Sequence, residues 1–93
     1  MITILGTGLL GSAFARASLR RGEQLGVWNR TLDRAAQLGK EGAKVFIDAG
    51  DAVRGAERIH MVLSDDVAVE SVIKTILPAL AQDTLLIDHT TTS

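Results

Sequence analysis

The chain has 93 residues, 46% of them hydrophobic, and a chain of this length builds one domain around one modest core. Ten basic and eleven acidic residues are spread along it for a net charge of −1, which argues against a surface that binds nucleic-acid backbones. It contains no cysteine, so disulfides, thiolate metal sites and cysteine nucleophiles are excluded.

The first 14 residues are apolar but contain three glycines and no basic segment, so they predict a strand, a loop and a helix start. Neither a signal peptide nor a membrane span is expected, and a cytoplasmic location follows by default. Helical spacing continues through Leu10, Ala13, Phe14 and Ala17, and Gly22 is expected to end this first helix.

Further short runs of apolar or β-branched residues predict more strands, with helical patterns between them. Counted with the first, the predicted strands are residues 2–5, 24–28, 44–47, 58–63 and 84–88. Thr31 is expected to cap a second helix that Gly39 and Gly42 end, and Asp48 is expected to cap a short third one. Pro78 either ends the fourth helix or extends it by one turn. That helix carries apolar residues at helical spacing: Val69, Val72, Ile73 and Ile76.

The strict alternation of strands and helical connections predicts the fold class. Such a pattern is typical of a parallel sheet with helices on both faces and right-handed crossovers. We therefore expect an α/β, doubly wound, Rossmann-type fold with five strands in the order 3-2-1-4-5. No repeat or linker interrupts the pattern, so residues 1–93 are expected to form a single domain.

A glycine-rich loop follows the first predicted strand and opens the first helix: Gly6, Thr7, Gly8, Leu9, Leu10 and Gly11. This context separates a dinucleotide-binding fingerprint from a chance match to the glycine pattern. Gly6 permits the tight turn, Gly8 lets the backbone approach a pyrophosphate, and Gly11 lets the helix pack closely on the strand. The phosphates would lie at the helix N-terminus, where free N–H groups and the helix dipole favour an anion. The alternative is a purely structural glycine turn.

The end of the second predicted strand indicates which dinucleotide is bound. NAD-binding chains have an acid there that binds the ribose hydroxyls, and this chain has Asn29 instead. Asn29 removes a charge that would repel a 2′-phosphate, and Arg30 adds a guanidinium suited to phosphate oxygens. Thr31 adds a hydroxyl while capping the next helix. Arg34, one turn later, either closes over the cofactor or remains solvated. Together these residues predict NADP.

Two more predicted strands deliver residues to the edge of the sheet where open α/β sheets bind ligands. Leu63 and Ser64 follow the fourth strand, and we expect backbone contact with the cofactor's ribose there. Asp65 and Asp66 are expected to begin the next helix rather than to act as an acid–base pair.

The chain ends in "DHTTTS", which follows the fifth predicted strand. The hydroxyls of Thr90 and Thr91 can donate to a carboxylate or an amide near the nicotinamide. His60 is expected to be a partly buried polar residue, because no second histidine or cysteine stands at metal-ligand spacing. His89 lies nearer the expected site, but nothing in the sequence makes it a catalyst.

In this order, the glycine loop, "WNRT", "VLSDD" and "DHTTTS" resemble the NADP-binding domain of the β-hydroxyacid dehydrogenases. That family includes 3-hydroxyisobutyrate dehydrogenase, tartronate semialdehyde and glyoxylate reductases, and 6-phosphogluconate dehydrogenase. The resemblance covers all 93 residues, and imine reductases share the same pattern.

The resemblance implies a role for each matching position. It implies pyrophosphate contacts along residues 6–11 and 2′-phosphate contacts at Asn29, Arg30 and Thr31. Thr90 and Thr91 match a Ser/Thr-Thr pair near the substrate carboxylate, with Thr91 also at the nicotinamide. His89 occupies a variable position. Further cofactor contacts are implied at Leu63, Ser64 and Ala68.

Members of the resembled family are much longer, and they add a helical domain that supplies a catalytic lysine and builds the dimer. None of the three lysines replaces it, because Lys40 and Lys44 flank the turn before the third predicted strand and Lys74 lies late in a helix. We therefore expect an incomplete cofactor domain, cut before the helical domain and inactive alone, with no catalytic residue of its own.

Three functions remain open at this point. The expected one is the NADP-binding part of an oxidoreductase that moves a hydride between nicotinamide and a small hydroxyacid or aldehyde acid. The second is a stand-alone NADP-binding sensor, which would not need Thr90 and Thr91, and the third is a scaffold with a structural glycine loop. Because residues 84–88 form an unguarded edge strand, a homodimer through that edge is also expected.

Overall fold

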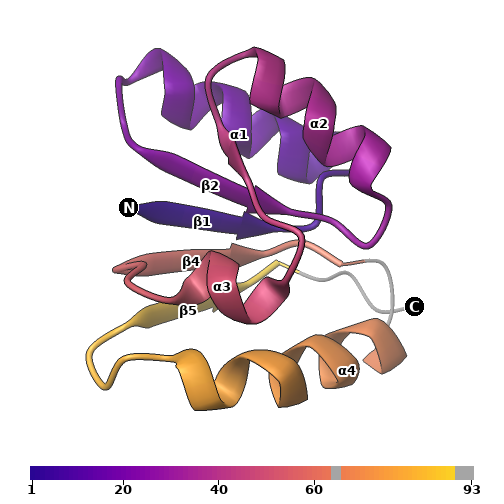
Figure 1. The fold of residues 1–93 in the computed structure, drawn as a ribbon, viewed down its shortest axis with the longest axis vertical. Helices are drawn as coiled ribbons and strands as arrows, with labels where there is room; N and C mark the ends of the chain where they lie inside the picture. Colours follow the sequence, from indigo (N-terminus) through magenta and orange to yellow (C-terminus); the bar gives the residue numbers. More distant parts are fainter. Residues whose placement is uncertain (64–65, 90–93) are drawn as a thin grey trace.

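The computed structural model describes residues 1–63 and 66–89, and within them five parallel strands form one sheet in the order β3-β2-β1-β4-β5 (Figure 1). The doubly wound α/β fold and the strand order predicted from the sequence are thus confirmed. The elements in chain order are β1 (Ile2–Leu5), α1 (Leu9–Arg20), β2 (Leu25–Trp28), α2 (Leu32–Lys40), β3 (Lys44–Val45), α3 (Ala49–Val53), β4 (Arg58–Met61), α4 (Asp66–Ile76), the 3-10 turn η1 (Leu77–Ala79) and β5 (Leu85–Asp88).

The helices cover the sheet on both faces, with α1 and α2 on one side and α3 and α4 on the other (Figure 1). β1 shows how the two sides are filled. Ile2 and Ile4 pack among the residues of α1 and α2, whereas Leu5 packs among those of α3 and α4. Thr3 also faces the second side, and its hydroxyl donates a 2.6 Å hydrogen bond to the carbonyl oxygen of Ala52. A strand buried on both faces is rich in apolar residues, as β1 is with three of its four residues apolar.

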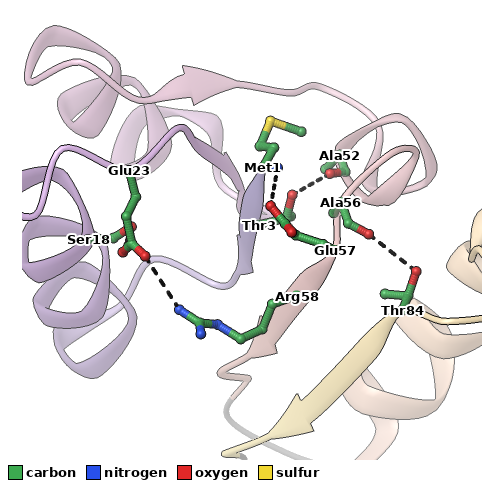
Figure 2. A network of polar contacts seen from close by, with 9 residues as sticks. All are labelled: Met1, Thr3, Ser18, Glu23, Ala52, Ala56, Glu57, Arg58 and Thr84. Carbon is green, nitrogen blue, oxygen red and sulfur yellow. Dashed lines mark hydrogen bonds and ion pairs between the residues drawn. The ribbon is translucent and has the colours of Figure 1, made fainter.

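Polar contacts tie the amino ends of the strands together, opposite the edge that carries the cavity described below (Figure 2). The Thr84 hydroxyl donates to the carbonyl of Ala56 over 3.2 Å, which attaches the start of β5 to the loop before β4. Glu23 accepts a hydrogen bond from Ser18 over 2.9 Å and lies 3.8 Å from the Arg58 guanidinium. These contacts link the strands at the end of the sheet opposite the cavity.

The predicted strands are correct in position but too long. The third was expected to continue to residue 47 and the fourth to residue 63, but they end at Val45 and Met61. β3 lies at an edge and pairs with β2 through only two residue pairs, after which the chain turns toward α3. The second and fifth strands each begin one residue later than predicted.

The helix ends differ from the prediction in two places. α2 runs through Gly39 to Lys40, and the glycine that follows its end is Gly42, whose φ of +117° suits a residue without a Cβ. Thr31 occupies the N-cap position, but its side chain makes no capping hydrogen bond. The Asp48 carboxylate does cap α3, because it accepts from the Gly50 amide over 2.8 Å.

The buried face of α1 was predicted about one position away from its true place. Gly11, Ala15 and Ser18 are buried, whereas Leu10 is half exposed. The helix rotates this way because Gly11 lies against the loop that precedes it. In the described part of the chain, no helix is both long and apolar enough to cross a membrane.

Candidate functional site

A cavity of about 280 Å³ opens at the carboxyl edge of the sheet, where the ends of β1, β2 and β4 meet the start of α4. This is the position at which doubly wound sheets bind ligands, because the strand order reverses there. The cavity is lined by Gly8, Trp28, Asn29, Arg30, Thr31, Arg34, Val62, Leu63, Ala68 and Val72.

The structure brings six of the site residues predicted from the sequence to this cavity. Gly8, the turn of residues 29–31, Leu63 and Ala68 share the cavity, and Arg34 joins them. Ser64, Thr90 and Thr91 lie outside the described residues. Within the glycine loop, Leu9 is 95% exposed and Leu10 is 47% exposed. Trp28, Val62 and Val72 were missed, since apolar residues in a strand and a helix give no signal that separates a cavity wall from the core.

The glycine loop, residues 6–11, has a shape that depends on Gly6 and Gly11. Gly6 has a φ of +103°, and a Cβ there would collide with the Val62 carbonyl. A Cβ on Gly11 would collide with the Gly6 carbonyl, which brings the start of α1 against the loop. A Cβ on Gly8 would meet nothing within 4 Å, so this position faces open space. The loop therefore offers bare backbone to whatever enters the cavity, at the N-terminus of α1.

The turn of residues 29–31 is joined to the glycine loop by one side chain. The Asn29 Oδ1 accepts a 3.1 Å hydrogen bond from the Thr7 amide, and the Asn29 Nδ2 donates to the Thr31 carbonyl over 2.9 Å. Arg30 and Arg34 are both exposed on the same wall of the cavity. Two guanidinium groups make this wall positive and suited to phosphate oxygens.

Thr7 is held inside the loop with only 3% of its surface exposed. Its carbonyl oxygen accepts a 2.9 Å hydrogen bond from the Ser12 hydroxyl. Its own hydroxyl is buried and has no hydrogen-bond partner among the described residues. A buried hydroxyl without a partner is costly, and in a binding loop it is a candidate for a ligand contact.

A second cavity, of about 450 Å³, lies beside the first and shares Trp28, Arg30 and Val72 with it. Trp28 lines both cavities, and its indole N–H donates to the Ile47 carbonyl over 3.1 Å. This bond fixes the indole plane. The two cavities together extend the crevice from the glycine loop to the start of α3.

Two histidines form a pair that the sequence did not reveal. The His60 Nδ1 and the His89 Nε2 lie 2.9 Å apart, and the rings are stacked with centroids separated by 5.1 Å. Phe14 of α1 packs on them, with its ring centroid 4.7 Å from that of His89. Burial lowers the pKa of His60 below its ordinary value of 6.5, and the nearby charge of Arg58 lowers it further. His60 is indeed partly buried, but its partner comes from the register of β4 and β5.

Neither histidine lines the cavity, and the lysines also lie elsewhere. Lys44 is placed over the Phe46 ring, 5.2 Å from its centroid, before the third helix. Over residues 1–63 and 66–89, no three histidines, aspartates or glutamates gather where they could hold a metal ion. The described part of the cavity can thus bind an anion, but it contains no side chain suited to proton transfer.

Residues 1–93 match the NAD binding domain of 6-phosphogluconate dehydrogenase. One curated relative, the NADPH-dependent reductive aminase of Aspergillus oryzae, is 32% identical over 85 residues, which are 91% of this chain and 29% of that protein.

Two solved structures share the fold over nearly the whole chain. The 3-hydroxyisobutyrate dehydrogenase of Mycobacterium tuberculosis, solved with L-serine, has a TM-score of 0.93 and 26% identity over 99% of this chain and 32% of that chain. An imine reductase from Myxococcus stipitatus in complex with NADP+ has a TM-score of 0.90 and 29% identity over 97% of this chain and 32% of its own. The chain spans about a third of the length of these relatives or less.

Proposed function

The chain belongs to the family of the NAD-binding domain of 6-phosphogluconate dehydrogenase, and from this premise we propose that it binds NADP(H) in preference to NAD(H). The observation that carries the proposal is the wall of the cavity formed by the turn of residues 29–31. It presents Arg30 and no carboxylate at the position where NAD-binding chains have an acid.

Further features of the cavity fit a dinucleotide. Gly8 leaves open the space that a Cβ would fill, so a pyrophosphate can approach the backbone at the N-terminus of α1. The buried Thr7 hydroxyl has no partner among the described residues and lies in the same loop. In the proposed pose, the guanidinium of Arg30 binds the 2′-phosphate, while Leu63 and Ala68 contact the cofactor from the other wall. Thr31 adds its hydroxyl, which the helix cap does not use.

We propose that an oxidoreductase containing this cofactor domain transfers a hydride between the nicotinamide and a small β-hydroxyacid or related aldehyde or keto acid. Thr90 and Thr91 are the proposed substrate contacts, with Ser64 and Thr91 completing the cofactor contacts; none of the three is among the described residues. An imine reductase is the second candidate, because an imine reductase and a reductive aminase are among the relatives. A stand-alone NADP sensor is the third.

Fluorescence titration of the chain with NADPH and with NADH tests the proposed cofactor. We expect tighter binding of NADPH, and Arg30→Ala should weaken it by roughly 10- to 150-fold, the range for one hydrogen bond to a charged group, with little effect on NADH. Arg54→Ala is the matched control, since Arg54 is exposed at the end of α3 and lies outside both cavities. Equal or reversed affinities of the wild type for the two cofactors would refute the proposal.

We also propose that the 93-residue chain alone does not turn over hydroxyacids or aldehyde acids. The described cavity lining contains no histidine or lysine, and general acid–base help is typically worth about 10²–10⁴-fold. Steady-state assays with NADP+ and with NADPH measure this. A rate that disappears in Arg30→Ala would show that the chain carries its own catalytic group.

A homodimer of this chain is the proposed assembly. β5 has a neighbour on only one side among the described strands, and Leu85 beside that edge is 55% exposed. Light scattering over a concentration series should show a dimer that Leu85→Lys dissociates. Leu85 is the better position to change, because Leu86 packs against the core. If the chain is a monomer at every concentration, or if Leu85→Lys leaves the dimer intact, the proposed contact through the β5 edge is refuted.

A further inference from the structure

Asn29 stands between two segments that the proposed cofactor would touch at different points. Its Oδ1 accepts from the Thr7 amide in the glycine loop over 3.1 Å, and its Nδ2 donates to the Thr31 carbonyl over 2.9 Å. One amide group thus bonds to the loop on one side and to its own turn on the other. Only a side chain with both an acceptor and a donor can make these two bonds.

The loop that Asn29 holds has few other restraints at that point. The Thr7 carbonyl accepts from Ser12 of α1, and the Gly6 amide donates to the Trp28 carbonyl over 2.7 Å. Thr7 is therefore fixed from α1 through its carbonyl and from the end of β2 through its amide. Removing either bond leaves a nearly buried peptide group free to turn, and Gly8 is the next residue.

An aspartate at this position would keep only half of the arrangement. A carboxylate could still accept from the Thr7 amide, but it has no hydrogen to donate, so its second oxygen would face the Thr31 carbonyl oxygen. The turn would have to move to relieve that repulsion, and Arg30 moves with it. The choice of asparagine is thus explained by the protein's own hydrogen bonds, before any cofactor is considered.

We propose that Asn29 is a positioning residue that couples the glycine loop to the turn of residues 29–31, and so sets affinity for NADP(H) and NAD(H) alike, while Arg30 sets the discrimination between them. This inference rests on the proposed function. It replaces the expectation that Asn29 itself contacts the 2′-phosphate. The reason is that the loop binds the pyrophosphate, which both cofactors share.

The test compares dissociation constants for NADPH and NADH in the wild type, Asn29→Ala, Asn29→Asp and Arg30→Ala. We expect Asn29→Ala to weaken both cofactors by a similar factor of about ten, as the loss of an ordered hydrogen bond would. The ratio of the two constants should stay near that of the wild type. Arg30→Ala should bring the two dissociation constants close to each other, with the constant for NADH nearly unchanged. Asn29→Asp should bind NADH no more tightly than the wild type.

The outcomes separate this inference from the proposed function. If Asn29→Ala weakens NADPH alone, Asn29 is a direct contact and the coupling is refuted. If Asn29→Asp gains affinity for NADH, the asparagine discriminates by charge and the coupling is again refuted. If Arg30→Ala leaves the ratio unchanged, the assignment of the discrimination to Arg30 is refuted, while the coupling by Asn29 stands. If the wild type binds both cofactors equally, the proposed NADP preference fails and the coupling is still tested by the parallel loss in Asn29→Ala. A wild type that binds neither cofactor overturns both.

A second variant covers the case in which Asn29 substitutions unfold the protein. Ser12→Ala removes the bond to the Thr7 carbonyl from the opposite side, through a side chain that does not line the cavity. It should show the same signature, a parallel loss for NADPH and NADH with the ratio retained. Thermal melting of each variant gives the folded fraction used to correct the titrations. No parallel loss in Ser12→Ala would refute the role of the loop restraint.

Discussion

Gly8 and Gly11 lie three residues apart in the same loop, and the structure predicts opposite effects for an alanine at each. At Gly11 the added Cβ would collide with the Gly6 carbonyl, a backbone atom that cannot rotate away. At Gly8 the added Cβ would meet nothing within 4 Å. Gly11→Ala should therefore strongly destabilise the fold, whereas Gly8→Ala should mainly weaken ligand binding.

The magnitude for Gly11→Ala comes from two opposing terms. Gly11 lies in α1, where alanine is intrinsically favoured over glycine by about 1 kcal/mol. Forcing an extra methyl into a closely packed contact typically costs about 1–3 kcal/mol, and a backbone partner places this case at or above the upper end. We expect a net loss of about 2 kcal/mol, which lowers the melting temperature of a domain this size by roughly 8–16 °C.

Gly8→Ala provides the matched control. Gly8 is the N-cap of α1 with φ −70°, a backbone conformation open to any residue, so the cost of alanine is about 0.5–1 kcal/mol. Its titration with NADPH should nevertheless show a large loss, since the methyl group fills the space proposed for the pyrophosphate. Thermal unfolding followed by circular dichroism measures both variants. A Gly11→Ala protein that melts above the wild type would mean that helix propensity outweighs the contact and that the close approach is wrong.

Three other changes have defined outcomes. The pKa of His60 is lowered in the folded protein, so as the pH drops below about 6.5 the unfolded protein binds a proton at this residue more readily than the folded protein does. The free energy of unfolding should therefore fall with decreasing pH, and it should fall less in His60→Gln. Thermal melting at a series of pH values measures both proteins. If the free energy of unfolding falls equally in both proteins, groups other than His60 cause the pH dependence. Thr3→Val keeps the side-chain shape but removes the buried hydrogen bond, so urea unfolding should show a loss of about 1 kcal/mol, and no loss would contradict that role. Asp48→Ala removes the side-chain cap of α3 and should lower the free energy of unfolding by about 1 kcal/mol. An unchanged free energy of unfolding would contradict this role of the cap.

The sequence predicts the local features of the site well and their mutual contacts poorly. Gly6 and Gly11 were assigned by spacing alone, and the structure gives each a backbone neighbour that excludes a Cβ. Asn29 was correctly placed at the end of β2, but its two hydrogen bonds were not foreseen. The His60–His89 pair was missed because the sequence pattern does not show that β4 and β5 bring the His60 Nδ1 and the His89 Nε2 within 2.9 Å of each other.

Strand ends were the least accurate part of the fold prediction. Residues 46–47 and 62–63 are apolar like the strands before them, so the pattern extends the strands into the loops. Whether a residue belongs to a strand depends on a paired neighbour, and Phe46 retains only a single bond to β2, from its amide to the Val27 carbonyl over 2.9 Å. The segments just beyond the strand ends are also the ones that line the cavities, with Ile47, Val62 and Leu63 among them.

The sequence by itself determined the order of the elements, the parallel sheet and the place of the glycine loop, because hydrophobic period and glycine spacing act over a few neighbouring residues. Only the tertiary structure decided that Asn29 accepts a hydrogen bond from the loop, that Trp28 lines two cavities and that the buried face of α1 begins at Gly11. The first two depend on groups far apart in the chain, as with Thr7 and Asn29, which lie 22 positions apart, and such contacts exist only once the strands lie in register. The third depends on the close packing of Gly11 on the Gly6 carbonyl, which appears only when the loop is folded.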